Sequence, residues 1–243
     1  MNIRTSAAVF AICSTLSILA TPAQALAKKS FDTTSTPTDE RVLVIGASVA
    51  QGQKDTRPKG GYLRRAFHAL NLLSDNHFTV VDKAVPGSTV RSIRKTYSNW
   101  LDAVHPNVVV IAWGGLNDLA RHTPFSEIQH EVHWQIDTAL KHHAAVILVT
   151  SPVSPASYTT YRVAQTDLFN SEVETAKRFH SQNVYIFNVF SQMKSYFAAH
   201  HEAYQPYMGD GWHPNAQGHE LAAQLFVKDW SNTFGTHPVR FQA

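Results

Sequence analysis

Hydrophobic residues along this chain gather in five short continuous runs, and the segments between the runs have the spacing of amphipathic helices. The runs cover residues 42–45, 78–81, 108–113, 144–150 and 184–187. Continuous apolar runs of this length are typical of strands covered on both faces. The intervening segments predict helices over residues 62–73, 92–104, 125–142, about 161–180 and about 216–230. Because this alternation favours βαβ units, we predict an α/β fold: a three-layer α/β/α sandwich around a mostly parallel five-stranded sheet.

Two of these predicted helices have local start signals. Ser126, followed three residues later by Gln129, fits a capping box at the start of the third helix. Pro214 and Asn215 precede the last helix, and asparagine is a good N-cap residue. We therefore expect both helices to begin at these positions.

The N-terminal segment has the pattern of an export signal. Arg4 supplies a positive charge, residues 7–20 form an uncharged apolar stretch, and residues 23–25 read Ala-Gln-Ala, a small-x-small cleavage site. A second cleavage site ends at Ala27. An uncleaved membrane anchor is the alternative, but the apolar stretch is short for about 30 Å of hydrocarbon. The sequence thus predicts a signal peptide over residues 1–25 and a secreted or extracytoplasmic protein with no stable membrane anchor after cleavage.

The rest of the chain predicts one domain behind a short leader. Residues 26–40 are rich in Ser, Thr and Pro, which is typical of a disordered segment. The folded domain should then fill residues 41–243. The one cysteine of the chain, Cys13, lies in the predicted signal peptide, so the mature chain would have no thiol for a disulfide, a nucleophile or a zinc ligand. A net charge of +3 with scattered basic residues gives no electrostatic footprint for nucleic acid, and we expect no nucleic-acid partner.

Three polar or small residues follow the first three predicted strands. Ser48, Gly87 and Asn117 each lie just beyond one of these strands. In an open parallel sheet, ligands bind beyond the carboxyl ends of the strands. We therefore expect these residues to meet at one edge of the sheet.

A catalytic triad is the chemistry that these residues predict together with a downstream turn. Asp210 and His213 are three residues apart in a segment that glycine and proline keep from forming regular helix. A carboxylate at this spacing can hold one imidazole nitrogen while the other accepts the proton of Ser48. Two simpler interpretations stay open: Ser48 caps a helix, and residues 210–213 form a surface turn before Asn215.

Donors for an oxyanion are also present. The backbone N–H of Ser48, the backbone N–H of Gly87 and the side-chain amide of Asn117 make three candidate donors for a tetrahedral intermediate. The competing interpretation is that Gly87, Asn117 and Asp118 only form turns.

These motifs resemble the SGNH (GDSL-type) hydrolase superfamily over approximately residues 41–232. The resemblance implies a flavodoxin-like fold and metal-free hydrolysis of esters or thioesters. It also implies the roles of Ser48 as nucleophile, Gly87 and Asn117 as oxyanion donors, His213 as base and Asp210 as its partner. One departure is visible, because the usual Gly-Asp-Ser-Leu stands here as residues 46–49, Gly-Ala-Ser-Val. An α/β-hydrolase is disfavoured, since its nucleophile elbow needs glycine where this chain has Ala50.

Other motifs are near misses. His130 and His133 flank a glutamate but are three residues apart, whereas the zinc-protease motif needs four. The histidine pairs at residues 142–143 and 200–201 are better explained as exposed residues near helix ends than as metal ligands. Residues 60–61 are Gly-Gly but lack the Lys-Ser/Thr of a phosphate-binding loop. We expect no metal and no cofactor.

The leading hypothesis is an exported carboxylic ester hydrolase that acts on a small-molecule, carbohydrate or lipid acyl ester. Two alternatives remain: a polysaccharide O-acyl esterase or O-acyltransferase using the same site, and a catalytically silent carbohydrate- or lipid-binding domain. Residues 151–161 follow the fourth strand and are expected to form part of the substrate pocket or an ordinary surface loop. Tyr207 and Met208, beside the Asp210 turn, could face substrate or pack the turn.

Overall fold

The computed structural model describes residues 31–33, 38–56, 60–74, 76–235 and 237–241. The predicted signal peptide, residues 1–25, lies outside the described residues. Within them, no helix is long and apolar enough to cross a membrane.

Five parallel strands form the central sheet of the described domain. They are β2 (Thr38–Gly46), β3 (Asn76–Asp82), β4 (Val108–Ala112), β5 (Ala145–Val149) and β6 (Val184–Phe187), in the order β3-β2-β4-β5-β6. Two short antiparallel strands, β1 (Phe31–Thr33) and β7 (Val239–Phe241), pair at one end of the molecule. The sheet order is the flavodoxin-like doubly wound one, so the predicted fold is confirmed.

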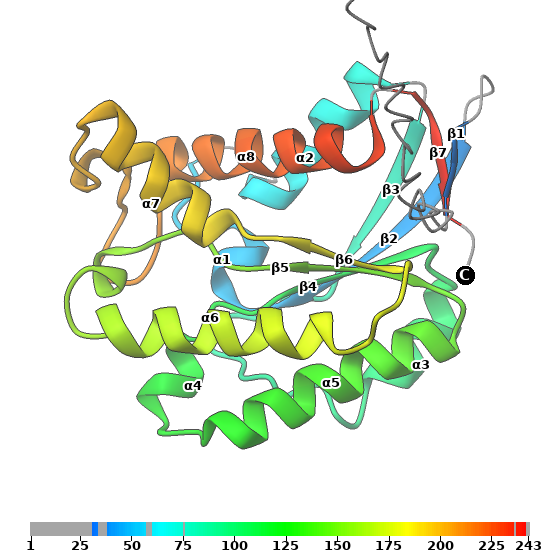
Figure 1. The fold of residues 1–243 in the computed structure, drawn as a ribbon, viewed down its shortest axis with the longest axis horizontal. Helices are drawn as coiled ribbons and strands as arrows, with labels where there is room; N and C mark the ends of the chain where they lie inside the picture. The colour runs from blue at the N-terminus through cyan, green and yellow to red at the C-terminus, as the bar shows by residue number, and fades with distance from the viewer. Residues whose placement is uncertain (1–30, 34–37, 57–59, 75, 236, 242–243) are drawn as a thin grey trace, which may run out of the picture.

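The helices cover both faces of the sheet (Figure 1). They are α1 (Ser48–Gln51), α2 (Tyr62–Leu73), α3 (Tyr97–Val104), α4 (Leu116–Ala120), α5 (Phe125–Lys141), α6 (Arg162–Lys177), α7 (Val189–His200) and α8 (Ala216–Phe234), with 3-10 turns η1 (Pro155–Ser157) and η2 (Gln205–Tyr207). Helices α2 and α8 lie on one side, and α3, α5 and α6 lie on the other.

Alternate strand residues supply the two halves of the core. In β2, Val42 and Val44 pack in the cluster that includes α2 and α8, whereas Leu43 and Ile45 pack in the cluster that includes α5 and α6. Because successive side chains of a strand point to opposite faces, a strand buried on both sides must be apolar at every position. This is why the strands are visible as continuous hydrophobic runs.

The predicted boundary at Arg41 is wrong, because ordered structure begins earlier. Strand β2 starts at Thr38, and β1 also falls within the predicted leader of residues 26–40. Thr38 is buried, with its Oγ1 2.9 Å from Asn76 Oδ1 and 3.0 Å from the carbonyl oxygen of Val239. These polar residues are ordered because the distant strand β7 covers them, a contact that local composition does not reveal.

Two helix predictions also need correction. Helix α3 starts at Tyr97 rather than at residue 92, since residues 90–96 form hydrogen-bonded turns whose buried side chains mimic helical spacing. The capping box at Ser126 does not form, because α5 begins at Phe125 after Pro124 and has no side-chain cap. Helix α7 was not predicted; the Asn188 side chain caps it by accepting from the Ser191 N–H at 3.1 Å.

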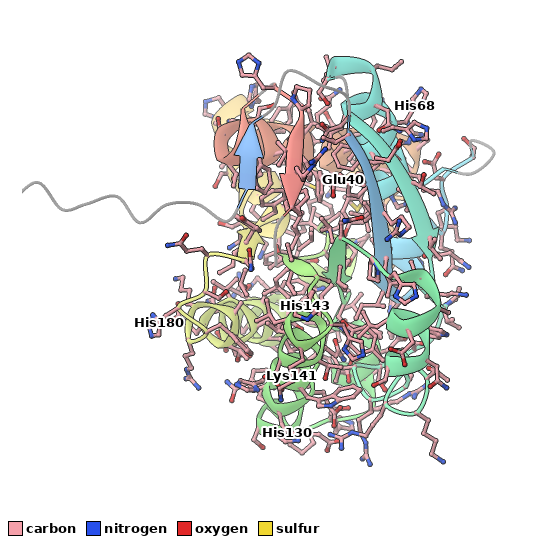
Figure 2. All side chains as sticks on the ribbon, turned by 90° about the vertical axis from the view of Figure 1, so that its right-hand side faces the viewer. Glu40, His68, His130, Lys141, His143 and His180 are labelled. Atoms are coloured by element: carbon pink, nitrogen blue, oxygen red, sulfur yellow. The ribbon has the colours of Figure 1, made fainter. Side chains whose placement is uncertain are left out.

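Glu40 is a buried carboxyl group at the start of β2, and Figure 2 shows it between β2 and β7. Burial raises its pKa from 4.5 to about 7, although the Phe241 backbone N–H and the positive charges of Arg240 and Arg41 lower it in part. The folded state therefore disfavours the carboxylate form. The stability that the neutral form contributes is complete below pH 4.5 and is lost as pH rises through about 7.

Replacing Glu40 with glutamine should remove this pH dependence. At pH 8 we expect Glu40→Gln to raise the free energy of unfolding by at most about 3 kcal/mol, with little change at pH 5. Urea unfolding of both proteins at the two pH values measures the difference. The neighbouring exposed Asp39→Asn is the control and should have a small effect at both. An equal effect of Glu40→Gln at both pH values would contradict the assignment.

Candidate active site

The carboxyl edge of the sheet brings Ser48, His213 and Asp210 together. Ser48 Oγ lies 2.9 Å from His213 Nε2, and His213 Nδ1 lies 2.8 and 3.0 Å from the two carboxylate oxygens of Asp210. A carboxylate accepts only, so Nδ1 carries the proton and Nε2 is left to accept from Ser48. The three side chains predicted to act together are therefore in hydrogen-bond contact.

The turn that carries Asp210 and His213 is organised by the carboxylate itself. Asp210 Oδ1 accepts the backbone N–H groups of Trp212 at 2.8 Å and of His213 at 2.9 Å. Gly209 donates to the His213 carbonyl at 2.9 Å. The Asn215 side chain then caps α8 by accepting from the N–H groups of residues 217 and 218, as predicted. The turn and the helix after it hold the imidazole in a defined place.

Asp210 stays ionised in this setting. Burial alone would raise its pKa, but the hydrogen bonds from the Trp212 and His213 N–H groups and from the imidazole lower it more, so the net pKa lies below the usual range. Lys54 Nζ lies 3.5 Å from Asp210 Oδ2, with both side chains partly exposed. The group facing His213 Nδ1 is thus a carboxylate acceptor.

Ser48 is the first residue of α1, and its side chain contacts His213 rather than capping the helix. At this position its backbone N–H has no intrahelical acceptor. Gly46, two residues before Ser48, packs closely against the backbone of β4. A Cβ at this position would lie 2.4 Å from the Ala112 carbonyl oxygen, so only glycine fits. Ala47, which stands where the usual motif has aspartate, is 3% exposed, packs in an apolar cluster and also lines the cavity beside Ser48.

Gly87 lies in a tight turn at residues 85–88. The Ser88 N–H donates to the Val85 carbonyl at 3.2 Å, Pro86 occupies the second position and Gly87 the third, with φ of +77°. Proline followed by glycine with positive φ is the signature of a type II turn. Within the described residues, no hydrogen bond takes up the Gly87 N–H. This donor is available to a ligand.

Asn117 lies in the first turn of the short helix α4. Its Nδ2 donates to the Ser88 carbonyl at 2.9 Å, which uses one of the two amide N–H bonds and leaves the other. The next residue, Asp118, is buried, and its Oδ2 accepts the Val90 N–H at 3.4 Å. Burial raises the pKa of Asp118 to about 6, although the hydrogen bonds from the Val90 N–H and the Thr123 side chain lower it in part. Helix α4 therefore fixes the loop after β3.

A small cavity opens beside Ser48 and His213. Its volume is about 10 Å³, room for one water-sized group. Besides Ser48 and His213, its lining includes Asn117, Ser151, Pro152, Ser154, Gln165 and Trp212. The predicted pocket loop, residues 151–161, thus contributes its first part. Trp212 is 36% exposed, and its ring meets that of Tyr161 edge to face at 6.3 Å between centroids.

The sequence profile of the GDSL-like Lipase/Acylhydrolase family matches residues 44–221, which is most of the chain. The chain belongs to this family. Among solved structures, this GDSL-like protein is similar to the acetylxylan esterase Axe2 of Geobacillus stearothermophilus (TM-score 0.66, 18% identity, 81% of this chain and 96% of that chain). It is also similar to LAE5, an α/β hydrolase enzyme from the metagenome of Lake Arreo, Spain (TM-score 0.64, 17% identity, 82% and 96%). No curated protein sequence matches the chain.

The family and the fold together make this chain an SGNH-superfamily member and an ester-bond serine hydrolase. At identities below a fifth, the similarity to solved structures concerns the fold. The departure at Ala47 is compatible with this membership, because Ser48 keeps its 2.9 Å contact with His213 Nε2 without a polar side chain at residue 47.

The structure also shows the contacts of other residues of the GDSL-like chain whose roles the sequence did not decide. Tyr207 donates its hydroxyl to Glu202, and Met208 pairs with Pro214 in an isolated bridge, so both pack the turn. Glu131, which lies between His130 and His133, is buried, and its Oε1 accepts a hydrogen bond from Arg94 Nη2 at 2.5 Å.

The histidines also have structural places. His143 and His201 follow the ends of α5 and α7 in the left-handed conformation, and Figure 2 shows His130 and His143 at separate positions along α5 and just after it. No group of three His, Cys, Asp or Glu residues in the described ranges is arranged to hold a metal ion.

Sequence reasoning missed four residues of the site region. They are Lys54, Arg121, Gln165 and Trp212. An exposed tryptophan between the predicted acid and base was a usable signal for Trp212. The other three lie outside the sequence motifs and reach the site region through polar contacts, which are the ion pair of Lys54 with Asp210 and the hydrogen bonds of Arg121 and Gln165 to the carbonyls of Gly87 and Gly114.

Proposed function

We propose that this hydrolase is exported and cleaves carboxylic esters through an acyl-enzyme on Ser48. The observation that carries the proposal is the continuous contact from Ser48 Oγ to His213 Nε2 at 2.9 Å and from His213 Nδ1 to Asp210 at 2.8 Å, beside a small cavity. Export rests on the signal-peptide pattern of residues 1–25.

The arrangement supports a two-step reaction. Ser48 Oγ attacks the ester carbonyl carbon while its proton passes to His213 Nε2, and the carbonyl oxygen becomes an oxyanion near the N–H donors of Ser48, Gly87 and Asn117. The C–O bond to the alcohol then breaks, and His213 returns the proton to the leaving oxygen. Water, deprotonated by His213, attacks the acyl-serine in the same way, and the acid and free Ser48 are released.

Covalent labelling tests the assignment of the nucleophile. After incubation with a fluorophosphonate, intact mass should show one adduct on the mature protein and none on Ser48→Ala. Ser151→Ala is the matched control, because this serine lines the same cavity and should leave labelling unchanged. Labelling that persists in folded Ser48→Ala would overturn the proposal. No labelling and no turnover in the folded wild type would favour the silent binding domain.

The acyl group is predicted to be short. A cavity of about 10 Å³ admits little more than a methyl group beside the reacting carbonyl. We expect kcat/KM to fall at least about tenfold from p-nitrophenyl acetate to butyrate, and to fall further for decanoate. Equal rates for acetate and decanoate would show that the cavity does not hold the acyl chain.

A second candidate function is the removal or transfer of acetyl groups on carbohydrate. Trp212 favours it, because an exposed indole face next to the base can pack on the C–H face of a sugar ring. The similar fold of an acetylxylan esterase is consistent with it. With an acetylated oligosaccharide, Trp212→Ala should raise KM at least about fivefold while p-nitrophenyl acetate hydrolysis changes less. Product analysis with added carbohydrate acceptor separates hydrolysis from transfer.

A further inference from the structure

The turn that presents the Gly87 N–H is held by hydrogen bonds rather than by packing. Val85 is 52% exposed, Pro86 and Gly87 are exposed, and a Cβ added at Gly87 would meet no atom within 4 Å. Glycine also allows wide rotation of the adjoining peptide groups. Whatever aims this donor must therefore be a polar contact to the turn.

Asn117 of α4 and Arg121, the residue that caps the end of this helix, supply such contacts. Asn117 Nδ2 donates to the Ser88 carbonyl at 2.9 Å, and Arg121 Nη2 donates to the Gly87 carbonyl at 3.1 Å. Residues four apart lie on the same face of a helix, so both side chains reach the same turn. The Arg121 backbone N–H bonds the Asn117 and Asp118 carbonyls at 3.2 Å, which ends the helix at this point.

We propose that Arg121 is a positioning residue of the oxyanion hole. Its guanidinium holds the Gly87 carbonyl, and this fixes the peptide group on one side of Gly87 so that the N–H on the other side keeps its direction toward the intermediate. Neither Arg121 nor Gly87 lines the cavity beside Ser48, and the contact between them is the hydrogen bond to the Gly87 carbonyl, so Arg121 would act by holding this turn. The inference rests on the proposed function, because it assigns Gly87 as a donor to the oxyanion.

The wider surroundings give Asn117 and Arg121 separate tasks. Asn117 both anchors the Ser88 carbonyl and keeps one N–H for the intermediate, whereas Arg121 only anchors. A hydrogen bond from a charged donor is stronger than a neutral one, and on an exposed turn it supplies order that packing does not. Without Arg121, the turn would keep its internal bond, the Val85 N–H bond to the Gly46 carbonyl at 3.2 Å and the contact from Asn117, but nothing would hold the Gly87 carbonyl.

The experiment is steady-state kinetics of Arg121→Ala on p-nitrophenyl acetate. We expect kcat to fall roughly 10- to 100-fold. This decrease should not exceed the decrease that follows the loss of a whole oxyanion donor. KM should stay within about twofold, since the contact matters in the transition state. Arg91→Ala is the matched control: this exposed arginine sits on the segment just after Gly87 and pairs with Glu127 at 2.9 Å, and its loss should leave kcat unchanged.

Further readouts separate positioning from general stability. Arg121→Lys should recover part of kcat because an ammonium can still donate to the carbonyl, and thermal unfolding of Arg121→Ala should match the wild type. In an Asn117→Ala background, the further loss from Arg121→Ala should be smaller than in the wild type, because the two side chains support one turn. Wild-type kcat in Arg121→Ala, or a loss that only tracks unfolding, would overturn the inference. Because wild-type turnover and Ser48 labelling are measured first, failure of the proposed function would be seen separately.

Discussion

Replacing Ser48 with alanine is expected to lower kcat for p-nitrophenyl acetate roughly a million-fold, down to the residual rate that binding and the oxyanion donors sustain. The physical reason is that alanine has no hydroxyl to attack the ester, while the change removes one oxygen from a half-exposed site and leaves the core intact. Circular dichroism and thermal unfolding should therefore match the wild type. Steady-state kinetics of the purified variant gives the measurement. The rate of ester hydrolysis in buffer without enzyme sets the detection limit.

His213→Ala should cost nearly as much, and the double variant Ser48→Ala/His213→Ala should be no worse than either single one. Groups that act as one unit are strongly non-additive in this way. Ser151→Ala again serves as the control for removing a hydroxyl at the cavity wall. If Ser48→Ala kept more than a hundredth of wild-type kcat, the acyl-enzyme on Ser48 would have to be abandoned.

The sequence predicted the central sheet well because each strand carries its own signal. The run at residues 108–113, for example, is apolar at every position, and β4 is buried on both faces. The errors arose where order depends on distant segments. Thr38 and Glu40 resemble a polar leader, but β7, about 200 residues later, covers them. Local pattern cannot contain such a contact.

The candidate site shows the same division. Ser48, Asp210 and His213 follow recognisable motifs, and the structure brings them within hydrogen-bond distance. Arg121 and Lys54 contact the site from positions that no motif marks, because their contacts depend on how the turn at Gly87 and the turn at Asp210 fold against neighbouring segments. The sequence therefore predicts the groups that would react better than those that would hold them in place.

Ala47 illustrates a residue whose role the sequence could not decide. The usual motif has an aspartate at this position, next to the nucleophile. In the structure the Ala47 side chain lies among apolar core residues, and the Ala47 carbonyl accepts the Gln51 N–H at 3.0 Å to start α1. The turn at Ser48 is thus supported by backbone geometry and by the close packing of Gly46 against β4.

The second large effect is expected for Asp210→Asn, with kcat lowered roughly ten-thousand-fold. Asparagine can still accept the backbone N–H groups that Asp210 accepts now, so the turn should keep its shape. Its side-chain NH₂ would face His213 Nδ1 and favour the tautomer with the proton on Nε2. That nitrogen could then no longer accept the proton of Ser48, and attack on the ester would be blocked although every group remained in place.

Lys54→Met separates this tautomer effect from a loss of charge. Lys54 contacts Asp210 at 3.5 Å and is 46% exposed, so its removal changes the local charge without touching the imidazole, and kcat should change less than about threefold. Fluorophosphonate labelling gives an independent measure, since it needs an activated Ser48 but no leaving alcohol from a substrate. Slow labelling of Asp210→Asn beside normal labelling of Lys54→Met would identify Asp210 as the residue that sets the tautomer. Comparable rates in all three proteins would mean that His213 is oriented by other contacts.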